Sequence, residues 1–195
     1  MSKGNPDHFY RKAKEQGFPA RSVFKLSELD QKYNLFRKRY KVLDLGASPG
    51  SWLVYITKQV EESGFVLGID LNSVAQTLSS NCRVIQMDIF NVQGSDLKKQ
   101  FGIFDVVVSD LAPKTTGNRE ADHARSYELC RHAFALAQEV LKPGGSFVCK
   151  MYQGEESKSF LEGLLQYFGM CKTQKPKASR STSREIFFVG RGFIP

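Results

Sequence analysis

KVLDLGASPGSW occupies residues 41–52 and joins a short apolar run to a turn that contains two glycines. An apolar run such as residues 41–45 is typical of a strand that is buried on both faces of a sheet. Gly46 and Gly50 allow tight backbone turns and close approaches that a Cβ atom would prevent. A helical pattern follows at residues 51–62. This succession predicts an α/β domain whose ligand lies at the carboxyl ends of the strands.

The same alternation continues along the chain. Strands are expected at residues 41–45, 65–70, 82–86, 104–109, 146–150 and 185–190. Helices are expected near residues 22–33, 51–62, 95–101, 121–141 and 155–168. Apolar strands that alternate with helices favour a sheet with helices on both faces. We therefore expect a doubly wound, mostly parallel α/β fold of the Rossmann-like kind, with residues 1–20 as a basic N-terminal arm and residues 21–195 as the domain.

The composition is that of an ordinary globular protein, with 41% hydrophobic and 25% charged residues in a chain of 195. No apolar run is long enough for a membrane span, and the first residues lack the apolar segment of a secretory signal. We therefore expect a cytoplasmic protein without a membrane partner. The four cysteines are scattered in apolar stretches, which favours buried thiols over a disulfide or a metal site.

The net charge of +8 is unevenly distributed along the chain. Residues 1–41 contain eleven Lys or Arg against four Asp or Glu, and residues 172–184 contain five basic residues and no acidic one. The segment between them is mildly acidic. Basic flanks on an acidic body are compatible with a polyanion such as RNA, although a solvated basic surface would have the same composition.

The residues that follow the first three strands favour S-adenosylmethionine over a nicotinamide cofactor. The turn at Gly46, Ser48, Pro49 and Gly50 lacks the G-x-G-x-x-G spacing that a pyrophosphate requires. A sulfonium cofactor has no phosphate and needs only close approach of the backbone to its amino-acid end. Asp70 is placed to accept hydrogen bonds from ribose hydroxyls, and Asp88 to accept one from the adenine amino group. Trp52 packs either beside the cofactor or in the core.

Two charged residues are expected to meet beyond the next strands. Asp110 follows the strand at 104–109, and Lys150 ends the strand at 146–150. Neighbouring parallel strands bring both to one pocket. Burial lowers the pKa of a lysine, whereas a nearby carboxylate raises it. The sequence leaves open which of these influences is larger.

Four motifs then show a specific resemblance. They are RSVFKL at residues 21–26, DLAP at 110–113, PGGSFVCK at 143–150 and SRE at 183–185. They resemble, in order, the Lys-Asp-Lys-Glu motifs of the FtsJ/RlmE family of RNA 2′-O-ribose methyltransferases, with the cofactor turn before the second of them. The similarity covers about residues 19–190.

The resemblance implies a class I methyltransferase fold and a specific set of site residues. Lys150 would be the central catalytic residue, with Asp110 and Glu185 as carboxylate partners and Lys25 as the second cation. The residues implied to line the cofactor site are Gly50, Trp52, Asp70, Asp88 and Asp110. Lys150 would either deprotonate the ribose 2′-hydroxyl or only orient it. The family's usual substrate is a uridine ribose in large-subunit ribosomal RNA. We therefore expect RNA as partner, either free or within the large ribosomal subunit, and a monomer without a metal ion.

The chain departs from the family pattern at two positions. Ser51 stands where a second glycine is usual, and Lys114 stands where a neutral polar residue is usual. The extra positive charge of Lys114 is compatible with a different RNA. The alternatives are therefore 2′-O-methylation of another RNA such as transfer RNA, and a non-catalytic RNA-binding protein of ribosome assembly. A dehydrogenase is disfavoured by the missing G-x-G-x-x-G.

Overall fold

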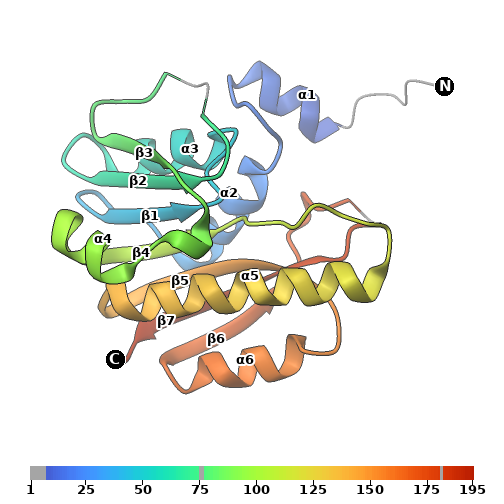
Figure 1. Cartoon of the computed structure of the whole chain (residues 1–195). Helices are drawn as coiled ribbons and strands as arrows, with labels where there is room; N and C mark the ends of the chain where they lie inside the picture. The colour runs from blue at the N-terminus through green and yellow to red at the C-terminus, as the bar shows by residue number, and fades with distance from the viewer. Residues whose placement is uncertain (1–7, 75–76, 181) are drawn as a thin grey trace.

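The computed structural model describes residues 8–74, 77–180 and 182–195, which form one seven-stranded sheet with helices around it (Figure 1). The strands are β1 (Lys41–Leu45), β2 (Phe65–Asp70), β3 (Cys82–Gln86), β4 (Phe104–Ser109), β5 (Leu141–Tyr152), β6 (Phe168–Gln174) and β7 (Glu185–Phe193). Their order across the sheet is β3-β2-β1-β4-β5-β7-β6. The first five strands pair in parallel, and β7 is antiparallel to both β5 and β6. The mostly parallel α/β fold expected from the sequence is confirmed.

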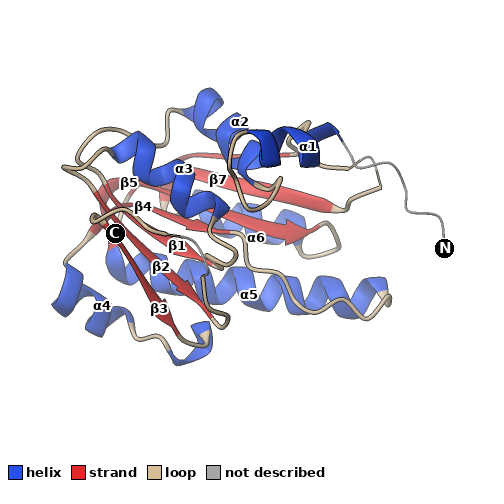
Figure 2. Ribbon diagram, turned by 90° about the horizontal axis from the view of Figure 1, so that it is seen from above, coloured by secondary structure: helices blue, strands red, loops and turns tan. Residues whose placement is uncertain are grey.

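Helices cover both faces of this sheet (Figure 2). They are α1 (His8–Glu15), α2 (Val23–Tyr33), α3 (Ser51–Val60), the 3₁₀ turn η1 (Ile89–Asn91), α4 (Gly94–Phe101), α5 (Arg119–Val140) and α6 (Ser157–Leu165). On one face α2 and α3 contribute Leu26 and Leu53 to a core with Val106 of β4. On the other face α5 and α6 contribute Ala137 and Phe160. The sheet is therefore buried on both sides, as its apolar strands require.

The long helix α5 is defined by a capped N-terminus and by an apolar side that packs on the sheet. Its N-terminus is capped by the side chain of Asn118, which accepts hydrogen bonds from the backbone N–H groups of two residues in the first turn. Its residues Cys130, Phe134 and Ala137 follow one another at helical spacing; Cys130 and Ala137 are buried, and the ring of Phe134 lies 5.5 Å from that of Phe147 in β5. The helix ends at Val140, because the next residue already pairs in the sheet.

The strand β6 was not expected from the sequence. Its residues were assigned partly to a helix at 155–168 and partly to a basic segment that begins at residue 172. The strand lies at an edge of the sheet and pairs only with β7 among the described residues. Buried Phe168 and Cys171 lie among exposed or half-buried neighbours, so no regular apolar alternation marks it.

The N-terminal segment is helical where it is described. Residues 1–7 lie outside the described part of the chain, and the expected boundary at residue 20 stays a prediction. Helix α1 packs against α2, with the ring of Phe9 at 5.6 Å from that of Phe24. The guanidinium of Arg21 lies over the Phe9 ring.

None of the helices in the described part of the chain combines the length and the apolar character of a transmembrane span. All four cysteines are free thiols with buried side chains.

Candidate active site

The loops that follow β1 and β4 meet at the carboxyl edge of the sheet. Gly46 has a φ of +84°, and a Cβ atom there would lie 2.9 Å from the backbone nitrogen of Leu111. The N–H of Asp110 donates to the carbonyl of Leu45 at 3.0 Å. Only glycine satisfies both the left-handed conformation and the close approach. The glycine at 46 therefore lets the loop after β4 close over the end of β1.

The expected cofactor turn is held by hydrogen bonds to its own neighbours. Asp70, at the end of β2, accepts a hydrogen bond from the N–H of Ser48 at 2.9 Å and another from the N–H of Asn72 at 2.7 Å. The Ser51 hydroxyl accepts one from the N–H of Ala20 at 2.7 Å. The serine that replaces the family's glycine thus ties the chain before α2 to the start of α3.

A cavity of about 700 Å³ opens beside this turn, within the size range of small-molecule sites. The sequence-predicted residues that line it are Gly46, Ser48, Asp70, Asp88 and Asp110. Pro49, Gly50 and Trp52 are not among its described lining. Trp52 lies in the core, where its indole N–H donates to the carbonyl of Ser22 at 3.1 Å and its ring lies 6.2 Å from that of Phe187.

Some lining residues had not been expected. Leu71 and Asn72 follow β2, and Met87 and Phe90 flank the predicted Asp88 after β3. Because they directly follow predicted strand ends, the rule that ligands bind there could have identified them. Leu71, Met87 and Phe90 are large exposed hydrophobic residues, and they give this part of the cavity an apolar wall.

Acidic side chains outnumber basic ones on the cavity wall, with Asp70, Asp88, Asp110 and Glu128 against Lys114 and Arg125. Asp44 of β1 is fully buried, and neither of its carboxyl oxygens has a hydrogen-bond partner in the described part of the chain. Burial raises the pKa of Asp44 well above its usual value, and the nearby carboxylates of Asp110 and Asp70 raise it further. A raised pKa favours the neutral form of Asp44, so the negative charge beside the cavity comes from the carboxylates of its wall. Their excess over the two cations there favours a ligand that carries positive charge over a pyrophosphate.

The four residues expected to carry the chemistry lie together at the edge of this cavity. The Nζ of Lys150 lies 2.7 Å from Asp110 Oδ1 and donates to the Asp110 carbonyl at 2.8 Å. It lies 3.8 Å from Glu185 Oε1. Lys25 Nζ lies 2.5 Å from the other oxygen of Glu185, Oε2. Helix α2 and the strands β4, β5 and β7 each bring one member of this cluster.

The antiparallel strand β7 accounts for the place of Glu185. In the β5–β7 register, Glu185 lies opposite Tyr152, and Lys150 lies two residues earlier on the same face of β5. The Ser183 hydroxyl donates to Glu185 Oε2 at 3.0 Å. The carboxylate therefore has one oxygen engaged by Lys25 and Ser183, and its Oε1 faces Lys150.

The structure answers the question of the Lys150 charge. Burial lowers the pKa of Lys150, but Asp110 and Glu185 together outweigh burial and raise the pKa above its usual value. For Glu185, burial raises the pKa, and the ammonium groups of Lys25 and Lys150 outweigh it and lower the pKa. Both shifts favour the charged forms of Lys150 and Glu185.

A second cavity, of about 400 Å³, lies on the other side of this cluster. It is lined by Arg21, Lys25, Thr115, Asp122, Tyr152, Arg180, Thr182, Ser183, Arg184 and Glu185. Arg21 precedes Lys25 by four residues, and Tyr152 follows Lys150 by two. The helical and strand periodicities could therefore have identified both from the predicted residues.

The chain matches the family model described as FtsJ-like methyltransferase over residues 18–193. It is 47% identical to Ribosomal RNA large subunit methyltransferase E of Desulfatibacillum aliphaticivorans, over 94% of this chain and 89% of that protein. It is 46% identical to the protein of the same name from Bdellovibrio bacteriovorus, over 95% and 96% of the two chains. A crystal structure described as a ribosomal RNA methyltransferase of Plasmodium falciparum superposes with a TM-score of 0.78 at 30% identity, over 90% of this chain and 98% of that one.

Proposed function

Because the chain belongs to the FtsJ-like methyltransferase family, we propose that it transfers a methyl group from S-adenosylmethionine to a ribose 2′-hydroxyl of large-subunit ribosomal RNA. The observation that carries the proposal is the cluster of Lys25, Asp110, Lys150 and Glu185 between an acidic cavity and a basic one. The names of the relatives supply the ribosomal substrate. Uridine as the methylated nucleoside rests on the family resemblance.

The larger cavity supports the choice of cofactor. Asp70 and Asp88 lie at the ends of β2 and β3, where they would hold the ribose and the adenine of S-adenosylmethionine. The carboxylates of the cavity wall would stabilise its positive charges. When bound, this cofactor supplies a methyl group that its sulfonium already makes reactive.

The chain's own residues would position and activate the ribose hydroxyl. The gap of 3.8 Å between Lys150 Nζ and Glu185 Oε1 is too long for a hydrogen bond. A hydroxyl oxygen placed beside both could accept a hydrogen bond from Lys150 and donate its own proton to Glu185. An ammonium has three N–H donors; Lys150 donates one to the Asp110 carbonyl, and its charge pairs with Asp110 Oδ1. A donor is thereby available to the substrate.

The proton balance follows from this arrangement. In the transfer, the methyl carbon would exchange its bond to the cofactor sulfur, which keeps the electron pair, for a bond to the ribose oxygen. The proton of the hydroxyl would pass to the Glu185 carboxylate and from there to solvent. Lys150 stays charged and stabilises the negative charge that develops on the oxygen. Lys25 keeps Glu185 in place through Oε2. Much of the acceleration would come from holding the oxygen in line with the methyl group.

A purely binding role accounts poorly for the buried charges. Lys25 and Lys150 are only 8% and 6% exposed, and desolvating an ammonium group costs several kcal/mol even when it is paired. A surface that only grips RNA needs exposed cations and no such buried cluster. This argument favours the enzyme over the non-catalytic alternative.

The test is methyl transfer from labelled S-adenosylmethionine to large ribosomal subunits, free ribosomal RNA and transfer RNA, each from cells that lack the enzyme. We expect label at one ribose of large-subunit RNA, and none with Lys150→Ala. The comparison of subunits with free RNA identifies the form of the substrate. Labelling confined to transfer RNA would refute the proposed substrate. RNA binding without transfer to any of the three would favour the non-catalytic alternative.

A further inference from the structure

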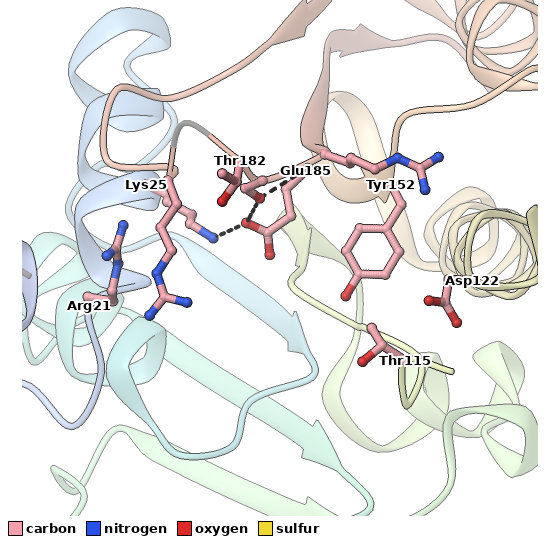
Figure 3. A pocket seen from close by; sticks show the side chains of 10 residues that line it. Arg21, Lys25, Thr115, Asp122, Tyr152, Thr182 and Glu185 are labelled. Atoms are coloured by element: carbon pink, nitrogen blue, oxygen red, sulfur yellow. Dashed lines mark hydrogen bonds and ion pairs between the residues drawn. The ribbon is translucent and has the colours of Figure 1, made fainter. Parts of the chain in front are cut away.

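The smaller cavity has two chemically different sides. Figure 3 shows Arg21 and Lys25 on one side, Tyr152, Asp122 and Thr115 on the other, and Glu185 between them. The pKa of Arg21 is lowered by burial and by the nearby guanidinium of Arg180, so two arginines share the basic side. Like charges placed so close are favourable when an anion lies between them. The opposite side has an aromatic ring, and the guanidinium of Arg184 near it donates to the carbonyls of Gln153 and Arg119.

Tyr152 is fixed in place by its main chain. Its N–H donates to the Ser126 hydroxyl at 3.0 Å, and its carbonyl lies 2.6 Å from Nδ1 of His123, which donates to it. Both partners belong to α5. On the other edge, the N–H of Gln153 donates to the carbonyl of Arg184 at 2.8 Å. The ring is therefore presented by a rigid strand end, which reduces the entropy lost when a ligand binds to it.

The hydroxyl of Tyr152 has no hydrogen-bond partner among residues 8–74, 77–180 and 182–195. Burial raises the pKa of this phenol, Lys150 opposes the rise, and the carboxylates of Glu185 and Asp122 add to it. The side chain is therefore a neutral ring near physiological pH.

Asp122 has a structural task beside this ring. Its carboxylate accepts hydrogen bonds from the N–H and the hydroxyl of Thr116, at 2.8 and 2.9 Å, and from the N–H of Gly117 at 3.3 Å. These bonds fix the loop that carries Thr115, which lies on the same side of the cavity as Tyr152. The space beside the tyrosine ring is thus bounded by a loop that Asp122 holds in place.

We propose that this cavity receives a single unstacked nucleotide, with its base on the Tyr152 ring, its phosphate at Arg21 and Arg180, and its ribose at Lys150 and Glu185. This inference rests on the proposed function, because it places the target ribose at the same four residues. An aromatic face stacks on any base, and arginine forks match phosphate oxygens. A nucleotide inside a duplex cannot present its base to this ring. The target must therefore leave its helix or lie in a single-stranded segment.

The test measures the KM for a stem-loop RNA that contains the mapped methylation site. Tyr152→Leu removes the aromatic ring, and Tyr152→Phe removes only the hydroxyl. Tyr152→Leu should raise the KM for RNA by about tenfold or more, since stacking on an aromatic residue contributes that much per base. Tyr152→Phe should stay within about threefold of the parent, because the ring remains. The affinity for S-adenosylmethionine should not change in either. Tyr167→Leu is the matched control, because Tyr167 lies at the other end of the sheet and packs on Phe134.

An abasic nucleotide at the methylation site tests the same contact without changing the protein. With the parent enzyme this RNA should show the same rise in KM as Tyr152→Leu shows with intact RNA, and combining both changes should add little. If abasic RNA is methylated with the parent KM, or if Tyr152→Leu has the parent KM, the stacking proposal is wrong. Should Tyr152→Leu fail to fold, the abasic RNA alone decides. Absence of methyl transfer by the parent enzyme would refute the proposed function instead.

Arg180→Ala tests the phosphate side. It should weaken RNA binding and reduce by about one the slope of log affinity against log salt. Lys99→Ala is its control, because the exposed Lys99 belongs to α4, before the amino end of β4 and outside both basic flanks. An unchanged slope for Arg180→Ala, or an equal change for Lys99→Ala, would overturn the assignment of the phosphate to this side.

Discussion

A change of pH from about 6.5 to about 8.5 distinguishes Lys150 as a cation from Lys150 as a base. The pKa of Lys150 lies above its usual value of 10.5, because Asp110 and Glu185 outweigh the effect of burial. Below that pKa, the neutral fraction of the amine rises tenfold with each pH unit. A reaction that needed the neutral amine would therefore become about 100-fold faster across this range. A reaction that needs the ammonium would keep the same rate.

The measurement is a single-turnover rate with saturating S-adenosylmethionine and RNA, so that binding and product release do not contribute. We expect a rate that changes less than about threefold. The Glu185 carboxylate is ionised throughout, because its pKa is lowered by the lysines that face it. Lys150→Arg keeps the charge and should retain measurably more activity than Lys150→Ala. A rate that climbs with unit slope, together with an inactive Lys150→Arg, would refute the cationic role and restore Lys150 as the general base.

Three further predictions concern the cofactor cavity, the core and the thiols. Asp70→Ala should weaken S-adenosylmethionine binding at least tenfold in calorimetry, with a domain that remains folded by circular dichroism; an unchanged Kd would exclude Asp70 from the site. Asp30→Ala should lower the free energy of unfolding by about 2–4 kcal/mol in urea titrations, because the buried carboxylate holds the N–H groups of Leu35 and Phe36 and the hydroxyl of Tyr55. The four buried cysteines should react with a thiol reagent only after unfolding, and fast reaction of the native protein would contradict their burial.

The parallel part of the sheet and the proximity of Asp110 to Lys150 could both be predicted from the sequence. Both follow from one rule, that side chains after neighbouring parallel strands gather at one edge. Glu185 was placed by family resemblance alone. Its position depends on β7 inserting between β5 and β6, a pairing between segments that are distant in the chain. The edge strand β6 has no clear alternation, so its pattern did not predict it.

Three properties of these residues could be established only from the three-dimensional structure. The pKa of Lys150 is decided by competition between burial and two carboxylates, and each contribution depends on how far apart the groups lie. Trp52 shows a second limit. An aromatic residue at the start of a helix after a glycine turn could face either the ligand or the core, and only the packing against Phe187 places it in the core. The isolation of the Asp44 carboxyl, likewise, is a three-dimensional property.

The position of β7 between β5 and β6 determines which parts of the site can form while the chain is still being synthesised. The cofactor cavity draws on residues 46–129, all of which have been synthesised well before Glu185. Lys25 and Glu185, which form an ion pair, are 160 positions apart in the chain. The pair forms only after β7 has paired with β5. A growing chain thus carries the parts of its cofactor cavity before it has the carboxylate that completes the four-residue cluster. The four-residue cluster is therefore complete only when the last strand of the chain has been made.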